Sequence, residues 1–377
     1  MEQIEKPDII FYARSLYNGG VDRVVFNLAE EFLSRGIRPA IVVDIDNPYS
    51  PFKDLIPKGV PYVVLGANGI VARMIKLRAY LRQTRPQAVM CTGFGFPNLC
   101  AVVMRWFAGF RFRLMLTEHC FPSVYHGEAK PWQARYWFFP LAHLLYPFAD
   151  NIVAVSKGTA KDLAKVIKID PQSITCIYNP IVNDGMIEAG DAAVDHPWFH
   201  DPSVPIIIAV GRLEHQKDFG TLITAFSQVR KQMRCRLMIL GDGTERDMLT
   251  GLVDQLGLSD DVALPGFAPN PHAYTKKANL FVLSSRFESL ANVVVEAMAL
   301  GTPVIATDCP SGPAEALDGG RFGRLVKVED PEMMAEAILD VLQKKPAPVP
   351  QTWLEQFTTR SSANRYLELL QPVPQFS

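Results

Sequence analysis

The hydrophobic residues of this chain fall into short runs rich in valine, isoleucine and leucine, which alternate with longer amphipathic segments. The runs are apolar at nearly every position, a pattern typical of strands buried on both faces of a parallel sheet. The amphipathic segments follow the helical period instead, as at 21–36, where the segment ends at Gly36. This alternation predicts an α/β fold in which helices connect parallel strands.

Two sets of strands are predicted, one in each half of the chain. The first set comprises residues 8–13, 39–44, 61–65, 88–92, 113–119, 151–156 and 175–180. The second set comprises residues 205–211, 235–241, 262–267, 280–285, 302–307 and 322–327. A polar, proline-bearing stretch at 183–205 separates the two sets, and a proline-rich connector at 345–353 precedes a final helix at 358–370.

This organisation predicts two Rossmann-like domains that face each other across a cleft. We place the first at 1–185 and the second at 186–350, followed by a helical segment at 351–377. In sheets of this kind, ligands bind beyond the carboxyl ends of the strands. Residues that follow a predicted strand are therefore the first candidates for a functional site.

The composition describes an ordinary folded protein, since 48% of the residues are hydrophobic and 20% are charged. A net charge of −1 supplies no basic field that would favour nucleic acid as a partner. Six scattered cysteines without a C-x-x-C pair indicate neither a disulfide framework nor a zinc knuckle, and favour a reducing cytoplasm. The acidic N-terminus enters a strand directly, and no run reaches about 18 apolar residues. We therefore expect neither a signal peptide nor a transmembrane helix.

The segment at 287–310 carries the strongest chemical signal. Glu288 and Glu296 stand eight residues apart, and between them a short polar loop leads into an apolar helix. Backbone N–H groups at a helix start bind phosphates, while carboxylates accept hydrogen bonds from sugar hydroxyls. A nucleotide-sugar, with a diphosphate between two sets of hydroxyls, fits this arrangement. Paired glutamates at a solvated helix start are the simpler alternative.

Two cations, Arg212 and Lys217, follow the predicted strand at 205–211. Fixed cations at such a position stabilise the negative charge that develops on a departing diphosphate, and can replace a divalent metal in that role. The sequence contains no H-E-x-x-H, no cysteine cluster and no D-x-D at a strand end. We therefore expect neither a metal site nor a bound cofactor.

Gly241 and Gly243 form a tight strand-to-helix turn, which permits close approach of the backbone to a ligand. The turn resembles the start of a dinucleotide-binding fingerprint. The G-x-G-x-x-G pattern is not completed, however, because Arg246 stands at its last position. An NAD-dependent enzyme is therefore disfavoured.

These motifs together closely resemble the donor-binding half of retaining GT-B glycosyltransferases, the group 1 enzymes of family-four type. The resemblance covers residues 206–328 and rests on a G-R-x4-K pattern, the L-G-D-G turn and the E-x7-E spacing. It implies a metal-independent site in which two cations hold the diphosphate and a carboxylate contacts the transferred sugar. The catalytic residues that it implies are Glu288, Lys217, Arg212 and His119.

The same resemblance implies a donor-binding set that extends beyond the charged residues. Glu296 binds the ribose hydroxyls in this family pattern, and the loop before the helix presents backbone N–H groups to the phosphates. Phe267 borders the base of the nucleotide. The implied set is Gly19, Gly20, Gly211, Arg212, Lys217, Gly241, Gly243, Phe267, Ser289, Leu290, Ala291, Asn292 and Glu296.

The first half of the chain shows a weaker resemblance to the same family. Gly19 and Gly20 match its glycine-rich loop before the first helix. His119, at the end of a predicted strand, matches a histidine that faces the outer hydroxyl of the sugar. The family pattern also implies that the last helix crosses back onto the N-terminal domain. The expected packing anchors are Trp353, Phe357 and Tyr366.

The resemblance implies transfer of a hexose or N-acetylhexosamine from a nucleotide-sugar, most often UDP-linked, to a lipid-linked or saccharide acceptor. Residues 309–317 are similar to bacterial transferases that build surface polysaccharide. The segments at 105–113 and 130–148 are both aromatic and basic, which suits either a membrane interface or a buried helix contact. We expect a cytoplasmic protein that contacts the anionic face of the inner membrane.

Two other kinds of function stay open from the residues alone. One is a related GT-B enzyme, such as a sugar-nucleotide epimerase or a sucrose-phosphate-type synthase. The other is a non-catalytic scaffold that keeps a nucleotide-sugar cleft. The intact set of two cations and two glutamates favours catalysis over the scaffold.

Overall fold

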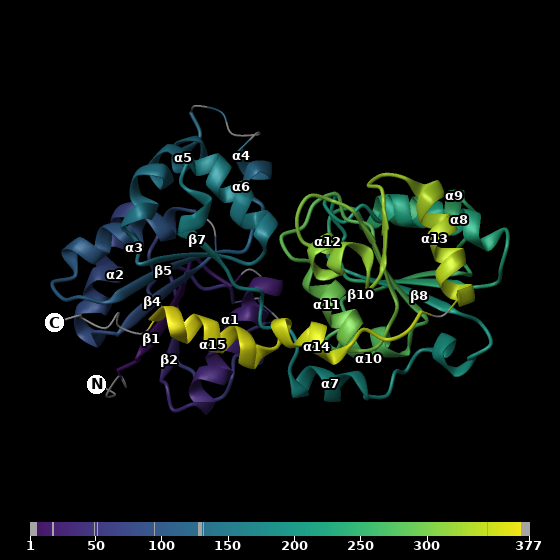
Figure 1. Ribbon diagram of the computed structural model, residues 1–377, viewed down its shortest axis with the longest axis horizontal. Helices are drawn as coiled ribbons and strands as arrows, with labels where there is room; N and C mark the ends of the chain where they lie inside the picture. The colour runs from purple at the N-terminus through teal and green to yellow at the C-terminus, as the bar shows by residue number, and fades with distance from the viewer. Residues whose placement is uncertain are drawn as a thin grey trace. The chain divides into compact units, whose positions relative to one another are not determined.

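The computed structural model describes residues 6–16, 19–48, 50, 52–93, 95–126, 130, 132–344 and 346–370 (Figure 1). The chain forms two compact units, and each is described by itself. Unit 1 comprises Met1–Pro180 with Thr359–Ser377, and unit 2 comprises Ile181–Thr358. The predicted α/β class, with one parallel sheet in each half of the chain, is confirmed.

Unit 1 is built on a seven-stranded parallel sheet in the order β3-β2-β1-β4-β5-β6-β7. Its strands are β1 (Ile9–Ala13), β2 (Pro39–Val43), β3 (Tyr62–Val64), β4 (Ala88–Thr92), β5 (Arg113–Glu118), β6 (Asn151–Ala154) and β7 (Ile174–Cys176). The order of the strands reverses between β1 and β4, which pair with each other in parallel. A reversal of this kind opens a crevice at the carboxyl ends of the strands.

Helices cover both faces of this sheet. Ile10 and Tyr12 of β1 pack in a core with α2, α3, α5 and α6, whereas Phe11 packs on the other face with α1 and α15. Burial on both faces explains why the strands are apolar at most positions. The helices are α1 (Gly20–Ser34), α2 (Ile70–Thr84), α3 (Phe96–Phe107), α4 (Pro122–His126), α5 (Ala134–Leu145), α6 (Lys157–Ile167) and α15 (Thr359–Leu370), with 3-10 turns at Lys53–Leu55, Tyr146–Phe148 and Pro171–Ser173.

Unit 2 repeats the scheme with a six-stranded parallel sheet in the order β10-β9-β8-β11-β12-β13. Its strands are β8 (Ile206–Val210), β9 (Arg236–Leu240), β10 (Val262–Gly266), β11 (Leu280–Leu283), β12 (Val304–Thr307) and β13 (Arg324–Val326). Here the order reverses between β8 and β11, which pair in parallel. The predicted strands of the second half are therefore present, and the reversal sets the carboxyl ends of β8 and β11 side by side.

The helices of unit 2 form a layer on each face of its sheet. One layer consists of α8, α9 and α13, which share an apolar core with alternate residues of the strands (Figure 1). On the other face, α10, α11 and α12 contact β8, β11 and β12. The helices are α7 (Asp184–Gly190), α8 (Phe219–Arg230), α9 (Arg246–Gln255), α10 (Pro271–Lys277), α11 (Asn292–Ala299), α12 (Pro313–Ala316), α13 (Pro331–Lys344) and α14 (Gln351–Leu354), with 3-10 turns at Pro197–His200, Asp318–Gly320 and Glu355–Phe357.

The end of the chain is divided between the two units. The last helix, α15, lies beside α1 in unit 1, where Tyr366 is fully buried (Figure 1). Trp353 and Phe357 belong to unit 2 instead, where Trp353 packs against Phe322 and its Nε1 donates to Ala316 O at 2.9 Å. The expectation that both of these residues anchor the last helix is therefore wrong. Because they precede α15, they fasten the connector to unit 2.

Candidate functional site

A charged pair lies where the strand order of unit 2 reverses. Lys217 follows β8 and Glu288 follows β11, so the pairing of these strands brings together two side chains that are far apart in sequence. Lys217 Nζ lies 2.5 Å from Glu288 Oε1, and the two side chains are only 15% and 9% exposed. Water screens such a pair weakly, so loss of either partner leaves a poorly solvated charge.

Glu288 is held through one of its two carboxylate oxygens. Ser285 Oγ donates to Oε1 at 2.8 Å, the same oxygen that Lys217 contacts. Within the described part of the chain, no hydrogen bond to Glu288 Oε2 is present. Oε2 is therefore the oxygen that can accept a hydrogen bond from a ligand hydroxyl.

Lys217 is positioned by the backbone beneath it. A Cβ atom at Gly211 would lie 3.2 Å from Lys217 Cε, so the glycine allows the lysine stem to lie against the main chain. Ser284 Oγ donates to the carbonyl oxygen of Lys217 at 2.7 Å. Gly211 thus acts through packing in this structure, which leaves the ammonium group at the carboxyl edge of the sheet.

Main-chain contacts tie the loop after β8 to the loop after β11. The Arg286 backbone N–H donates to Gln216 O at 2.8 Å, and Gln216 Nε2 donates to Phe287 O at 3.0 Å. Both contacts flank the Lys217–Glu288 pair in the sequence. The pair therefore stands on two loops that are fixed to each other rather than on independent segments.

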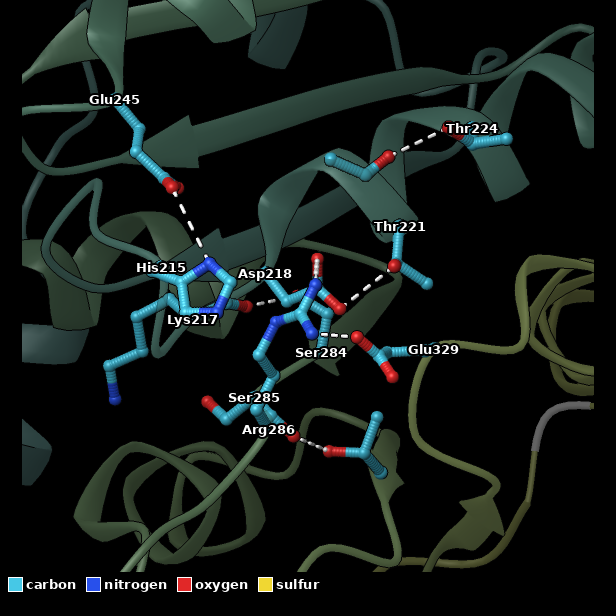
Figure 2. A network of polar contacts seen from close by, with 12 residues as sticks. His215, Lys217, Asp218, Thr221, Thr224, Glu245, Ser284, Ser285, Arg286 and Glu329 are labelled. Carbon is cyan, nitrogen blue, oxygen red and sulfur yellow. Dashed lines mark hydrogen bonds and ion pairs between the residues drawn. The ribbon is translucent and has the colours of Figure 1, made fainter. Parts of the chain in front are cut away.

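Figure 2 shows the side-chain network that surrounds these loops. Arg286 Nη2 donates to Asp218 Oδ1 at 3.2 Å, and Arg286 Nη1 forms an ion pair with Glu329, which follows β13. Thr221 Oγ1 donates to Asp218 Oδ2 at 2.8 Å. One guanidinium group therefore connects three loops at the carboxyl edge of the sheet.

The two glycines of the predicted turn approach protein backbone. A Cβ at Gly241 would lie 1.9 Å from Gly211 O, and one at Gly243 would lie 2.4 Å from Leu213 O. Any side chain at either position would collide with the loop after β8. The structure thus explains both glycines by the packing of two loops that border the site.

The loop before α11 is compact and strained at one residue. Ala291, the N-cap residue of α11, has φ 63° and ψ 65°, a left-handed conformation that costs a non-glycine residue roughly 1 kcal/mol. Gly312 packs on the backbone of Leu290, and Ser311 Oγ donates to Ser289 O at 2.9 Å. The segment 309–312 therefore supports the loop that leads to Asn292 at the start of the helix.

The remaining candidates of unit 2 do not contact the Lys217–Glu288 pair among the described residues. The Arg212 side chain is 59% exposed and pairs with Glu214 at 3.1 Å. Glu296 lies on α11 with its carboxylate 3.7 Å from His272 Nδ1 on α10. Phe267 follows β10 and is 52% exposed. Each of these residues lies on a segment that follows β8, β10 or β11.

In unit 1, His119 follows β5 and is buried in a neutral form. Thr117 Oγ1 donates to Cys91 O at 2.7 Å, so it accepts a hydrogen bond from His119 Nε2 at 3.2 Å. Nε2 therefore carries the proton, and Nδ1 presents a lone pair. Burial lowers the pKa of His119 to about 4, against a smaller opposing effect of Asn179. At neutral pH the imidazole is a hydrogen-bond acceptor rather than a cation.

Glu118, the residue before His119, is a buried acid that the sequence analysis did not single out. Its Oε1 accepts from Tyr146 OH at 2.6 Å and from Asn98 Nδ2 at 3.0 Å, and its Oε2 has no hydrogen-bond partner among the described residues. Burial raises its pKa to about 8, so the carboxyl group holds its proton at neutral pH. The signal in the sequence was a glutamate at the end of an otherwise apolar strand.

The glycine loop of unit 1 is described only in part, because residues 17 and 18 lie outside the described ranges. Gly19 is the N-cap residue of α1, and its N–H donates to Asp22 Oδ2 at 3.4 Å. Gly20 is the first residue of that helix. The loop is therefore capped by a side chain of its own helix.

Two family models match the chain and together take in most of it. The model described as Glycosyl transferases group 1 matches residues 195–355, and the model described as Glycosyltransferase Family 4 matches residues 18–184. The first match includes every strand of the unit 2 sheet, and the second includes β2 to β7 of unit 1. The chain belongs to the group 1 glycosyltransferase family.

Relatives of this group 1 chain are named for steps in bacterial glycan assembly. One is the N-acetylgalactosamine-N,N'-diacetylbacillosaminyl-diphospho-undecaprenol 4-alpha-N-acetylgalactosaminyltransferase of Campylobacter jejuni, 33% identical over 66% of this chain and 65% of that protein. Another is the lipopolysaccharide core biosynthesis glycosyltransferase LpsE of Rhizobium meliloti, 33% identical over 48% of this chain and 54% of that protein. The alignments therefore span between about half and two thirds of these relatives.

Solved structures share the fold of the whole group 1 chain. Anabaena Alr3699/HepE in complex with UDP aligns with a TM-score of 0.79 at 18% identity, over 96% of this chain and 99% of that one. A glycosyltransferase from Rickettsia africae aligns with a TM-score of 0.78 at 16% identity, over 98% and 100% of the two chains. These neighbours are GT-B proteins, and at this identity they establish the fold.

The described side chains and helices also bear on metals and membranes. Within the described ranges, His, Cys, Asp and Glu side chains form no group of three or more that could hold a metal ion. Among the helices described, none has the length and apolar character needed to cross a bilayer.

Proposed function

We propose that this group 1 chain is a metal-independent, retaining glycosyltransferase. It transfers a hexose or N-acetylhexosamine from a UDP-linked donor to a lipid-linked or saccharide acceptor during surface glycan biosynthesis. Unit 2 binds the donor and unit 1 binds the acceptor. The observation that carries the proposal is the largely buried Lys217–Glu288 pair at the reversal point of the unit 2 sheet.

The pair combines the two charges that such a transfer needs. Lys217 places an ammonium group where the bridging oxygen of the diphosphate gains negative charge, and a fixed cation in a poorly solvated site lowers the barrier. Glu288 Oε2 accepts a hydrogen bond from a hydroxyl of the transferred sugar, while Oε1 keeps its hydrogen bonds from Lys217 and Ser285. One carboxylate therefore links the sugar to the cation that binds its leaving group.

The other donor contacts surround this centre. Arg212, exposed beside Glu214, turns toward the diphosphate as a second cation. The positive end of the α11 dipole attracts the phosphates. Glu296 on the same helix accepts hydrogen bonds from the ribose hydroxyls. Phe267, exposed after β10, packs against the base. The complete proposed donor set is Gly211, Arg212, Lys217, Gly241, Gly243, Phe267, Ser289, Leu290, Ala291, Asn292 and Glu296, with Gly19 and Gly20 from unit 1.

The proposed reaction needs no protein nucleophile. The bond from the anomeric carbon to the phosphate oxygen breaks, and the acceptor hydroxyl oxygen bonds to the same carbon on the same face. The acceptor proton passes to the departing phosphate oxygen. Lys217 and Arg212 stabilise the charge on that phosphate, and positioning of the reactants supplies most of the remaining acceleration. His119, a neutral acceptor, orients an outer hydroxyl of the sugar.

The choice of substrates is supported by the named relatives. The Campylobacter jejuni protein is named for an undecaprenol-diphosphate-linked acceptor and an alpha linkage. The Anabaena fold neighbour was crystallised with UDP and with UDP-glucose. A lipid-linked acceptor and a UDP-linked donor are therefore the first substrates to test here.

A lipid-linked acceptor requires access to a membrane, and one face of unit 1 suits an anionic bilayer. Residues 55–117 contain no Asp or Glu, and this stretch forms both α2 and α3. Large apolar side chains are exposed on α2, on α3 and on α5 and its end. The most exposed are Val71, Ile75, Trp106, Phe107, Trp137, Leu144 and Phe148, each between 52% and 72%.

Basic side chains stand among these apolar residues. Lys76, Arg78 and Arg82 are exposed on α2, and Arg78 Nε donates to Phe107 O at 2.7 Å, which joins α2 to the end of α3. Trp106 packs against Phe148 with ring centroids 5.2 Å apart. Aromatic and cationic side chains gathered on one surface are typical of proteins that lie at the headgroup level of anionic lipids. We propose that this face contacts the membrane.

Vesicle flotation tests the membrane contact. The full chain should float with vesicles containing anionic lipid at low salt, and should not float with neutral vesicles. The Trp137→Ala/Leu144→Ala variant should lose most of this binding. Met248→Ala is the matched control, because Met248 is an exposed apolar residue of unit 2 at 51% exposure. Equal flotation of all three proteins would contradict the assignment of this face.

The transfer reaction is tested by product analysis in EDTA. UDP-hexoses and UDP-N-acetylhexosamines are incubated with the protein and an undecaprenol-diphosphate-linked saccharide, and UDP release and product mass are measured. Proton NMR of the product then gives the anomeric configuration. Free UDP with an extended lipid-linked glycan of retained configuration supports the proposal. An isomerised sugar-nucleotide would indicate an epimerase, a sugar phosphate product a synthase, and donor binding without any product a scaffold.

A further inference from the structure

We propose that Arg286 is a positioning residue that fixes Lys217 against Glu288. The inference rests on the proposed function, because it assigns a further residue to the same site. Arg286 contacts neither the Lys217 ammonium nor the Glu288 carboxylate among the described residues. It acts through the two loops that carry them.

Several contacts join the loop after β8 to the loop after β11. Arg286 pairs with Asp218 through its side chain and with Gln216 through its backbone N–H. Those two partners flank Lys217 on either side, and Arg286 stands two residues before Glu288. The Arg286–Asp218 pair therefore lies next to the Lys217–Glu288 pair along both loops. Loss of the first pair removes the charged side-chain link between the loops and leaves two neutral ones, Gln216 Nε2 to Phe287 O and Ser284 Oγ to Lys217 O.

Arg286 also neutralises the charge of Asp218. Asp218 is only 7% exposed, so its carboxylate has little access to solvent. Without the guanidinium, Thr221 Oγ1 is its remaining hydrogen-bond donor among the described side chains. A buried carboxylate without a cation is then driven toward solvent, which moves the loop that carries Lys217 away from Glu288. Arg286 neutralises Asp218 and so keeps Lys217 at the proposed donor site.

Arg286 further links these two loops to the loop after β13. Arg286 Nη1 pairs with Glu329, which follows β13 and has a left-handed φ of 58°. The planar guanidinium presents several donors in a fixed geometry, so one side chain can hold two carboxylates at once. A lysine at this position keeps the charge but not the fork. Arg286→Lys should therefore retain part of the effect, whereas Arg286→Ala should retain none.

The chain offers a matched control in the same unit. Arg230 is 26% exposed, against 27% for Arg286, and its Nε donates to Asp261 Oδ2 at 2.7 Å. This pair joins the end of α8 to the start of β10, at the amino end of the sheet. Arg230→Ala thus removes an ion pair whose arginine has the same exposure, without touching the loops of the site.

The direct test is the chemical reactivity of Lys217 in the full-length protein. Competitive acetylation with acetic anhydride, followed by peptide mass spectrometry, compares Lys217 with the reference Lys231 in each variant. Loss of a charge-assisted hydrogen bond should raise the relative rate of Lys217 by roughly tenfold in Arg286→Ala. Arg286→Lys should give an intermediate rate, and Arg230→Ala the wild-type rate. An unchanged rate in Arg286→Ala, or an equal rise in Arg230→Ala, would overturn the proposal.

Steady-state kinetics give a second readout that a merely structural role would not produce. Misplacement of a reacting group by about 1 Å costs on the order of a hundredfold in rate, so kcat should fall in Arg286→Ala while KM for the acceptor stays near the wild-type value. Arg286→Lys should recover part of kcat. Equal loss of kcat in the Arg286→Ala and Arg230→Ala variants would contradict a specific role of Arg286.

The two readouts separate this inference from the proposed function. Acetylation needs no donor, so a wild type that transfers no sugar but shows the Arg286-dependent protection of Lys217 contradicts only the function. A wild type that transfers sugar and shows no such dependence contradicts only the positioning role. If Arg286→Ala fails to fold, Arg286→Lys carries both tests, with wild-type reactivity and kcat as the contradicting result.

Discussion

The ends of two strands, β8 in unit 2 and β5 in unit 1, solve different chemical problems on the same kind of sheet. Lys217, beyond β8, is charged and is paired with Glu288 at 2.5 Å. His119, beyond β5, is kept neutral by burial, and Glu118 beside it holds its proton. Both strands are largely buried, so the residues at and after their carboxyl ends make the difference.

This difference matches the two parts of the proposed reaction. A fixed cation is useful where a diphosphate departs, because it stabilises charge that appears in the transition state. Neutral groups are useful where a hydroxyl must be oriented, because a charge there would be costly to bury without a partner. The charged edge is therefore assigned to the donor and the neutral edge to hydroxyl recognition.

The largest expected effect is at the charged edge. Lys217→Ala and Glu288→Ala should each lower kcat by at least about 10²–10³-fold, because each removes a preorganised charge from the reacting centre. Neither loss should unfold the chain, since the pair lies at the edge of the sheet rather than in a core. UDP release assays and thermal unfolding of both variants check this prediction. Activity near that of the wild type in either variant would refute the assignment of the pair.

A smaller effect is expected at His119. His119→Ala should reduce kcat/KM by about tenfold, the value of one neutral hydrogen bond. Because the pKa of His119 is about 4, its imidazole stays neutral around pH 6.5. The kcat/KM values of the wild type and of His119→Ala should therefore depend on pH in the same way near pH 6.5. The pH profile of both proteins between pH 5 and 8 provides the measurement. A change in kcat/KM near pH 6.5 that is present in the wild type and absent from His119→Ala would contradict this prediction. It would mean that the imidazole of His119 titrates there and that the carboxyl end of β5 is not neutral.

Glu118 should control stability rather than rate. Its folded pKa, about 8, is above the ordinary value of 4.5, so its contribution to stability is fully present below pH 4.5 and is lost as pH rises through 8. Glu118→Gln, which imitates the protonated acid, should therefore unfold at a higher temperature than the wild type at pH 8.5 and lose this dependence on pH. The difference should amount to roughly 2–4 °C for each kcal/mol of ionisation cost. Parallel unfolding curves for the two proteins from pH 5.5 to 9 would contradict the buried, protonated state.

The smallest effect concerns strain in the loop before α11. Ala291→Gly should stabilise the chain by about 0.5–1 kcal/mol, because glycine adopts the left-handed conformation without a steric cost. Ala299→Gly is the matched control at the other end of the helix and should destabilise by a similar amount. Chemical denaturation of both variants gives the comparison. A loss of stability in Ala291→Gly would show that the loop is not strained at this residue.

The fold was largely predictable from the sequence, because strands buried on both faces leave a continuous apolar signal. The runs at 8–13 and 205–211, for instance, became β1 and β8 with both faces covered. The positions of Lys217, Glu288 and His119 beyond strand ends were likewise readable. Spacing along the chain and the rule that ligands bind at carboxyl ends were sufficient for these.

Other features depend on contacts that a linear pattern does not contain. The link between Arg286 and Asp218 joins residues separated by 68 positions, and only the pairing of β8 with β11 brings them together. Arg212 and Lys217 are near in sequence, yet one side chain is 59% exposed and the other 15%. Gly241 is predicted to allow a ligand to approach, and the structure adds a packing contact that the sequence does not contain, since a Cβ there would lie 1.9 Å from Gly211 O.

The proposed membrane face was also visible only in part. The aromatic and basic segments at 105–113 and 130–148 stood out in the sequence, but α2 did not. Its exposed Val71 and Ile75 lie among basic residues, so its amphipathic pattern resembles that of an ordinary helix. The contact from Arg78 to Phe107 is what joins α2 to the same surface.

Calorimetric titration of UDP, GDP, ADP and NAD into the purified chain in EDTA tests the central claim most directly. We predict that one nucleoside diphosphate, first of all UDP, binds with a micromolar Kd without metal, and that Lys217→Ala weakens this binding while Arg230→Ala does not. NAD should not bind. Absence of binding by every diphosphate, or binding that Lys217→Ala leaves unchanged, would contradict the account.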